Sequence, residues 1–245
     1  MLKKYYSVRL HDKNTWFPII ILILYFTYKM LNPQLVDKAP WDFYEYHFFD
    51  AYFSAFFYYY SVTLLEIPLY FIYLFVNQTF FSNTAVYLRF TNIKEYWNKR
   101  LSTIAIDAAI YIFIMYLLLF NNFIYFNHIS TFFENWSFIF KSILSQWISF
   151  LVLGILFSFF SFLFIHPFIG MFITYIPVIL DFVLTTTKID MPPIFFIRTI
   201  CLDPTYMEGY WYMILLMFGI SAGLYLLSTP LFENRDFLTK EVVES

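Results

Sequence analysis

Residues Val86–Leu101, VYLRFTNIKEYWNKRL, form one of the few basic segments in a chain that is otherwise mostly apolar. At helical spacing the apolar side chains share one face: Val86, Phe90, Ile93, Trp97 and Leu101. The polar side chains share the opposite face: Asn92, Glu95, Asn98 and Lys99. A basic amphipathic segment with tryptophan on its apolar side is typical of a helix that lies flat on a membrane surface. Because this segment lies between two long apolar runs, its side of the membrane fixes the topology of the whole chain.

The composition places the chain among membrane proteins. Of its 245 residues, 61% are hydrophobic and only 13% are charged, whereas a typical soluble domain carries about 25% charged residues. The mean hydropathy is +0.65. The formal net charge of −2 gives no electrostatic reason to expect nucleic-acid binding. The single cysteine, Cys201, excludes an intramolecular disulfide and a paired-cysteine metal or redox site.

Five apolar runs, one of them long enough for two crossings, predict an all-α, polytopic membrane protein with six transmembrane helices in one domain, 1–245. The predicted spans are residues 16–31, 51–75, 104–126, 143–165, 168–184 and 210–227. The fourth and fifth spans come from one run that is too long for a single crossing, and Pro167 and Gly170 mark the turn between them. The first run is followed by NPQLVDKAPW, which lacks a small-residue cleavage site, so we expect a retained span.

Two segments outside these spans also carry a pattern. Residues Met1–Thr15 hold four basic residues and a loose apolar stripe, which predicts a short interfacial helix. A basic tail that only sets the topology is the alternative interpretation. Residues Thr185–Gly209 contain MPPIFFIRTICL, in which apolar residues surround two prolines, and this predicts an outer segment that re-enters the membrane.

The distribution of lysine and arginine predicts the orientation of the chain. If both termini lie on one side, that side holds ten of the 15 basic residues and the opposite side holds five. The positive-inside rule then makes both termini cytoplasmic.

Three acidic residues are predicted within or near the spans: Glu66, Asp107 and Asp181. The apolar residues of the second span contribute roughly −4 to −7 kcal/mol to insertion, against about +3 kcal/mol for a central charged Glu66. A carboxyl group inside a membrane is a candidate functional group. The alternative for Glu66 is a structural role, in which it pairs with a hydroxyl or caps backbone freed by Pro68. Asp107 and Asp181 are expected near span ends, where a carboxylate costs little.

The sequence predicts no catalysis in this chain. Its five glycines form no Gly-rich loop with Lys and Ser or Thr, so energy from ATP would have to come from another chain. The four histidines are scattered and lack metal-ligand spacing, so we expect no metal and no cofactor. Small residues recur at helical spacing, where they permit close helix approach: Gly154, Ser158 and Ser161, and Gly219 and Gly223.

Two functions remain. Six spans, cytoplasmic termini and an amphipathic cytoplasmic segment favour a transporter permease that is driven by a separate ATPase. A partner can grip such a segment and turn its own motion into a rearrangement of the spans. The alternative is a non-transporting membrane protein, such as an immunity or assembly factor, in which the same segment is a passive loop on the membrane.

The chain resembles the permease subunits of bacterial type-2 ABC exporters, especially the short permeases of low-GC Gram-positive bacteria. The resemblance rests on MLKKYYSVRL at the N-terminus, YLRFTNIKEYWNKRL after the second span and MPPIFFIRTICL before the sixth. Its most distinctive positions are Arg89, Phe90, Trp97 and Arg100. In that family the three features are an elbow helix, a coupling helix docked in a cleft of the ATPase, and an outer re-entrant pair.

The resemblance implies a working unit of two permeases, like or unlike, and two cytoplasmic ATPase subunits that hold ATP and Mg²⁺. It implies that the ATPase is contacted by these residues: Arg89, Phe90, Glu95, Tyr96, Trp97, Lys99 and Arg100. The expected function is export of a peptide, an antimicrobial compound or another amphipathic or lipid-like compound across the bacterial cell membrane. The chain departs from the family in its 26% aromatic content and its sparsely charged spans, which argue against a highly charged cargo.

Overall fold

The structure is a computed structural model that describes residues 2–31, 52, 56–90, 92–164, 166–186, 196–201 and 210–233. All regular elements in these ranges are helices, which confirms the predicted all-α class for this part of the chain. In chain order they are α1 (Leu2–His11), α2 (Lys13–Leu31), α4 (Tyr59–Ser61), a π-helix (Val62–Glu66), α5 (Ile67–Ser82), α6 (Thr84–Tyr87), α7 (Ile93–Tyr125), α8 (Ile129–Glu134), α9 (Trp136–Phe164), α10 (Pro167–Thr186), α11 (Phe196–Ile200) and α12 (Tyr210–Glu233).

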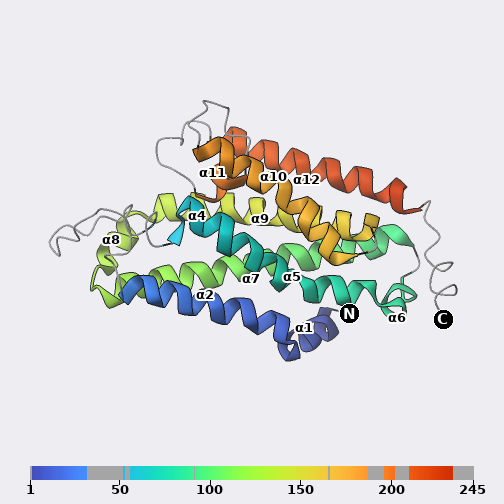
Figure 1. Ribbon diagram of the computed structural model, residues 1–245, viewed down its shortest axis with the longest axis horizontal. Helices are drawn as coiled ribbons and strands as arrows, with labels where there is room; N and C mark the ends of the chain where they lie inside the picture. The colour runs from blue at the N-terminus through green and yellow to red at the C-terminus, as the bar shows by residue number, and fades with distance from the viewer. Residues whose placement is uncertain are drawn as a thin grey trace.

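The long helices run side by side along the longest axis of the molecule (Figure 1). Helix α9 is central, because it contacts α5, α7, α10, α11 and α12, while α2 packs on α5 and α7. One end of the bundle, which we call the α1 end, brings together α1, α6, the start of α7 and the C-terminal part of α12. Helix α8 lies at the opposite end (Figure 1).

Within the described ranges, five helices are long and apolar enough to cross a membrane: Tyr59–Ser82, Ile93–Tyr125, Trp136–Phe164, Pro167–Leu184 and Tyr210–Ser228. Their length and apolar composition are those of a membrane-embedded protein, and they overlap five of the six predicted spans. The predicted span 16–31 forms α2, which is not among the five, so the count of six is not confirmed. Most of the predicted re-entrant segment, residues 187–195 and 202–209, lies outside the described residues.

Helix α5 continues past the predicted end of the second span, because two amide side chains near its end are buried with partners. The Asn77 side chain donates to the Thr103 hydroxyl at 2.8 Å, and the Gln78 side chain donates to the Ser158 hydroxyl at 2.8 Å. A buried amide that is hydrogen-bonded in this way no longer opposes burial. These two residues, which lie beyond the predicted span, therefore extend the packed interface.

The π-helix interrupts the second span immediately before Pro68. In a π-helix a carbonyl pairs with the N–H group five residues later, so the Thr63 carbonyl would need the N–H group that Pro68 lacks. The Tyr175 hydroxyl of α10 donates to this carbonyl at 2.7 Å. The Tyr111 hydroxyl of α7 donates to the Glu66 carbonyl, also at 2.7 Å. Two tyrosines thus fasten the π-helix to α7 and α10.

The two patterns of small residues lie in different environments. A Cβ atom at Gly154 would lie 2.6 Å from Ile104 Cγ2 and 2.9 Å from the Tyr70 hydroxyl, so α5, α7 and α9 meet closely there. A Cβ atom at Gly219 or Gly223 would have no heavy atom within 4 Å. Gly154 is therefore required by packing inside the chain, whereas the glycines of α12 lie on an open face.

We expect Gly154→Ala to destabilise the fold, because its added methyl group meets Ile104 and Tyr70 at less than van der Waals separation. Overpacking of this kind costs about 1–3 kcal/mol, which should lower the thermal unfolding midpoint in detergent by roughly 2–10 °C. Gly219→Ala is the matched control, since its methyl group enters open space. Equal midpoints for the two variants would contradict the packing at Gly154.

Candidate functional site

The sequence predicts that segment 86–101 is one helix lying flat on the membrane surface, but the structure divides this segment between two helices. Helix α6 ends at Tyr87, and α7 begins at Ile93 and continues without a break to Tyr125. The Asn92 side chain caps α7, because its Oδ1 atom accepts from the Glu95 backbone N–H at 2.7 Å. Residues 93–125 contain no proline or glycine, so nothing ends the helix at the membrane surface. Residues 93–101 of the predicted coupling segment are therefore the first part of a helix that is long and apolar enough to span a membrane.

The apolar stripe predicted for this segment is confirmed, but protein covers it rather than lipid. Val86 and Trp97 are buried, and the other three stripe residues are half-buried against the same cluster. The cluster also contains Tyr5 of α1 and Phe81 of α5. The periodicity identified the buried face correctly and misjudged what lies against it.

The seven residues that the family resemblance assigns to ATPase contact fall into two groups. Arg89, Glu95 and Lys99 are exposed, and Phe90 is half-buried. Tyr96, Trp97 and Arg100 are buried, with at most 1% of their surface exposed. The first group lies at the surface, where a partner could contact it. The second group packs inside the protein and cannot contact a partner directly.

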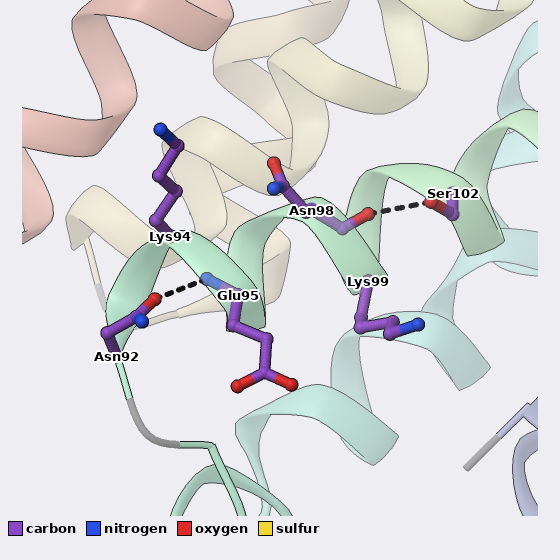
Figure 2. Close-up of a pocket in the computed structure, with 6 residues that line it drawn as sticks. All are labelled: Asn92, Lys94, Glu95, Asn98, Lys99 and Ser102. Atoms are coloured by element: carbon purple, nitrogen blue, oxygen red, sulfur yellow. Dashed lines mark hydrogen bonds between the residues drawn. The ribbon is translucent and has the colours of Figure 1, made fainter.

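The exposed side of the α7 start is a shallow polar hollow of about 480 Å³ (Figure 2). It is lined by Asn92, Lys94, Glu95, Asn98, Lys99 and Ser102. The Ser102 hydroxyl donates to the Asn98 carbonyl at 2.8 Å, and the Tyr225 hydroxyl of α12 donates to Asn98 Oδ1 at 2.8 Å. Figure 2 shows Lys94 pointing away from Glu95 and Lys99, so the two lysines flank the hollow.

Arg100 joins three helices beneath this hollow. Its guanidinium donates to Gln78 Oε1 of α5, and to the Tyr96 hydroxyl at 3.1 Å. Gln78 in turn donates to Ser158 of α9 at 2.8 Å. Because each group is buried, the chain of hydrogen bonds fixes α5, α7 and α9 relative to one another.

A second buried network fixes α1 to the bundle. Arg9 Nη1 lies 2.7 Å from Asp107 Oδ2, with 3% and 0% of the two side chains exposed. The Tyr5 hydroxyl donates to Asp107 Oδ2 at 2.5 Å, and the Tyr6 hydroxyl donates to Oδ1 at 3.3 Å. The Arg9 guanidinium also donates to the Tyr73 carbonyl at 3.1 Å and lies 3.8 Å from the centre of the Tyr73 ring.

The charges of this network keep its hydrogen bonds in one arrangement. Burial, and then the Asp107 carboxylate, raise the pKa of the Tyr5 and Tyr6 hydroxyls above the usual value, so both hydroxyls remain donors. Burial is the largest single effect on the Arg9 pKa and lowers it, but the Asp107 carboxylate together with Tyr73 and Tyr5 raises it by more, so the net pKa is raised. The guanidinium therefore stays charged at physiological pH.

The other two predicted intramembrane acids are also fully buried but differ in their partners. Neither carboxyl oxygen of Glu66 has a hydrogen-bond partner in the described part of the chain, and the nearby Lys29 donates to Ser61 instead, at 2.9 Å. Asp181 Oδ2 accepts from the Ile197 backbone N–H at 2.5 Å. Asp181 therefore fixes α11 to α10, which is a structural role, whereas Glu66 makes no such contact.

Helix α11 is also held by polar side chains of α9. Ser145 donates to the Thr199 carbonyl at 2.7 Å, Ser149 donates to the Thr199 hydroxyl at 2.7 Å, and Gln146 donates to the Ile200 carbonyl at 2.8 Å. The apolar stretch that the sequence singles out before the sixth span thus includes a short helix docked on the bundle.

No group of three or more His, Cys, Asp or Glu side chains that could hold a metal ion occurs within the described ranges. Comparison of the chain with models of protein families, with curated proteins and with solved structures gave no match.

Sequence reasoning missed the residues that build the two buried networks. The sequence places Arg9 only in a basic N-terminal stretch, and Asn77 and Gln78 lie just beyond the predicted second span, 51–75, with no role predicted for them. The spacing of Tyr5 and Arg9, four residues apart, was the one available signal, because it puts a hydroxyl and a cation on the same face of a helix. Their partner, Asp107, is distant in the sequence, so only the fold brings the network together.

We expect Asp107→Asn to destabilise the protein strongly, because Arg9 would stay buried without its carboxylate. Removing one partner of a buried ion pair costs about 3–5 kcal/mol. The exposed residue Glu134 offers a matched control, Glu134→Gln, that should leave the thermal unfolding midpoint unchanged. The double variant Arg9→Met/Asp107→Asn should lose less than the sum of the two single variants in unfolding measurements. Additive losses would show that the pair is not coupled.

Proposed function

We propose that this protein is the permease subunit of a bacterial ABC exporter whose ATP hydrolysis takes place in a separate subunit. Its cargo is a peptide, an antimicrobial compound or another amphipathic or lipid-like compound. In this proposal α2 also crosses the membrane, as the first of six spans. Both termini are cytoplasmic, and the α1 end faces the cytoplasm of a multi-pass protein in the cell membrane.

One observation carries the proposal: the exposed charged residues at the start of α7 stand on an unbroken helix that continues into the membrane. Glu95 and Lys99 are exposed on α7 at the α1 end, Arg89 is exposed just before this helix, and no break separates residue 93 from residue 125. A helix hydrogen-bonded throughout moves as one body over short distances. A partner that displaces this exposed end therefore displaces the membrane-spanning part as well.

The buried networks extend such a displacement to neighbouring helices. Arg100 links α7 to α5 and α9, and Asp107 links α7 to α1. Closure of ATP-loaded partner subunits would move α7 together with these helices. The resulting rearrangement opens a path for cargo between two permease copies.

The burial of the candidate spans supports a partner permease on the side of α10 and α12. Only 22% and 17% of the most apolar stretches of these two helices are buried inside the protein, against 50–61% for the other three candidate spans. A helix face that is not covered by its own chain is covered by lipid or by another protein. The second copy, like or unlike, is assigned to this face.

The non-transporting alternative rests on the filled interior. Aromatic side chains such as Tyr70, Phe71, Tyr111, Phe150 and Phe157 pack tightly along the centre of the described bundle. A single chain with such an interior is suited to a passive immunity or assembly role. The presence of an ATPase gene beside this gene favours transport, and its absence favours the passive role.

We expect replacement of Arg89 and Glu95 by Ala to weaken stimulation of a co-purified ATPase by about tenfold, because two charged hydrogen-bonding groups are removed from the contact. ATP hydrolysis is measured in nanodiscs, with Lys13→Ala as the control because Lys13 is exposed on α2. Binding and stimulation equal to those of the unchanged protein would remove the coupling role from the start of α7.

The orientation gives a separate prediction. A membrane-impermeant amine reagent applied to intact cells should leave Lys94 and Lys99 unmodified, and both should react after the cells are opened, since both are exposed. Peptide mass spectrometry measures the modification. Modification of either lysine in intact cells would place the α1 end outside and contradict the proposed orientation.

A further inference from the structure

One side of α7 carries a continuous series of lining residues that changes from polar to apolar along the helix. At spacings of three or four residues it runs as follows: Asn98, Ser102, Ala105, Ala109, Phe113 and Tyr116. Asn98 and Ser102 line the polar hollow of Figure 2. The following four residues line two adjoining apolar hollows between α7 and α9, of about 470 and 330 Å³.

The apolar hollows form one groove, because they share Ala109, Phe113 and Trp147. The short side chains of Ala105 and Ala109 form its floor, and Phe113 and Trp147 stand on opposite helices as its walls. The Trp147 indole N–H donates to the Ala105 carbonyl at 3.0 Å.

No polar group of this groove is left to bind a polar guest. The Tyr116 hydroxyl donates to the Ser142 hydroxyl at 2.7 Å, and the Trp147 N–H donates to the Ala105 carbonyl. The remaining lining side chains are alanine, isoleucine, leucine and phenylalanine. A guest that fits this groove is a hydrocarbon chain.

The polar hollow offers the opposite chemistry at one end of the groove. Lys99 and Lys94 make no ion pair or hydrogen bond with their side chains, and the Asn98 amide NH₂ group donates to no acceptor, within the described residues. Glu95 and Lys94 lie at least one turn further from the groove than Lys99, so the side of the hollow nearer to the groove carries the positive charge of Lys99.

The length of α7 puts this cationic side at the level of lipid headgroups. Its 33 residues extend about 50 Å at 1.5 Å per residue, whereas the hydrocarbon core of a bilayer is about 30 Å thick. The apolar groove begins at Ala105, about 9 Å along the axis from Lys99. A lysine side chain at this height meets phosphate groups, and the groove behind it meets acyl chains.

We propose that this side of α7 binds one phospholipid, with an acyl chain in the groove between α7 and α9 and its phosphate on Lys99 and Asn98. The binding site is independent of the exporter proposal, because it needs only a membrane-embedded α7. An anionic headgroup binds more tightly than a zwitterionic one, since no ammonium group of the lipid is then present to oppose the charge of Lys99.

The test is native mass spectrometry of the full chain released from detergent, titrated with phosphatidylglycerol and, in parallel, with phosphatidylcholine. Ala109→Trp fills the groove from an exposed position, so the bundle core is not overpacked. Lys99→Gln removes the charge. The matched controls are Leu215→Trp on the exposed face of α12 and Lys13→Gln on α2. Thermal unfolding in lipid-free detergent verifies that each variant is folded.

We expect one tightly held phosphatidylglycerol per unchanged chain, and loss of binding by about tenfold in both Ala109→Trp and Lys99→Gln, with no change in the controls. Lys99→Gln should affect phosphatidylcholine less than phosphatidylglycerol. Unchanged phosphatidylglycerol binding in either folded variant, or equal loss in the controls, overturns the site. ATPase stimulation is not a readout of this experiment, so its result stands apart from that of the exporter proposal.

Discussion

The ion pair between Arg9 and Asp107 is the contact on which the α1 end depends. Both groups are withdrawn from solvent, so neither can be present without the other except at a large cost. The pair brings a ten-residue N-terminal helix against α5 and α7, and it does so through four kinds of contact: an ion pair, tyrosine hydroxyls, a backbone carbonyl and an aromatic ring. An N-terminal segment that composition alone would leave as a loose basic tail becomes part of the folded bundle.

Polar contacts of this kind carry specificity inside a membrane protein. Lipid tails solvate apolar side chains nearly as well as other helices do, so burial of leucine or phenylalanine selects helix neighbours only weakly. The interior of this chain accordingly places hydrogen-bonding side chains at helix contacts: Asn77 with Thr103, Gln78 with Ser158, and Ser149 with Thr199. Each of these pairs specifies which two helices meet and at what height.

Much of the fold could be predicted from the sequence, because long apolar runs separated by polar connections report directly on helices that need a membrane. The site was predicted less well. Periodicity showed that Trp97 and Val86 share a face, but it could not say whether lipid or protein covers that face. Likewise, the partners of Arg9 and Gln78 are remote in the sequence, and a single sequence contains no signal of that proximity. The sequence identifies the lysines at the start of α7. The groove next to them could not be predicted, because it depends on how α7 and α9 lie relative to each other.

The π-helix sets the rotation of everything that follows it in the second span. One additional residue in a helical turn rotates all later side chains by about 100° about the helix axis. Asn77 and Gln78 lie on that later part, and their bonds to α7 and α9 demand the rotated position. A straight α-helix of the same sequence would direct both amides away from Thr103 and Ser158. The irregularity beside Pro68 is thus the device that aligns the distant amide contacts.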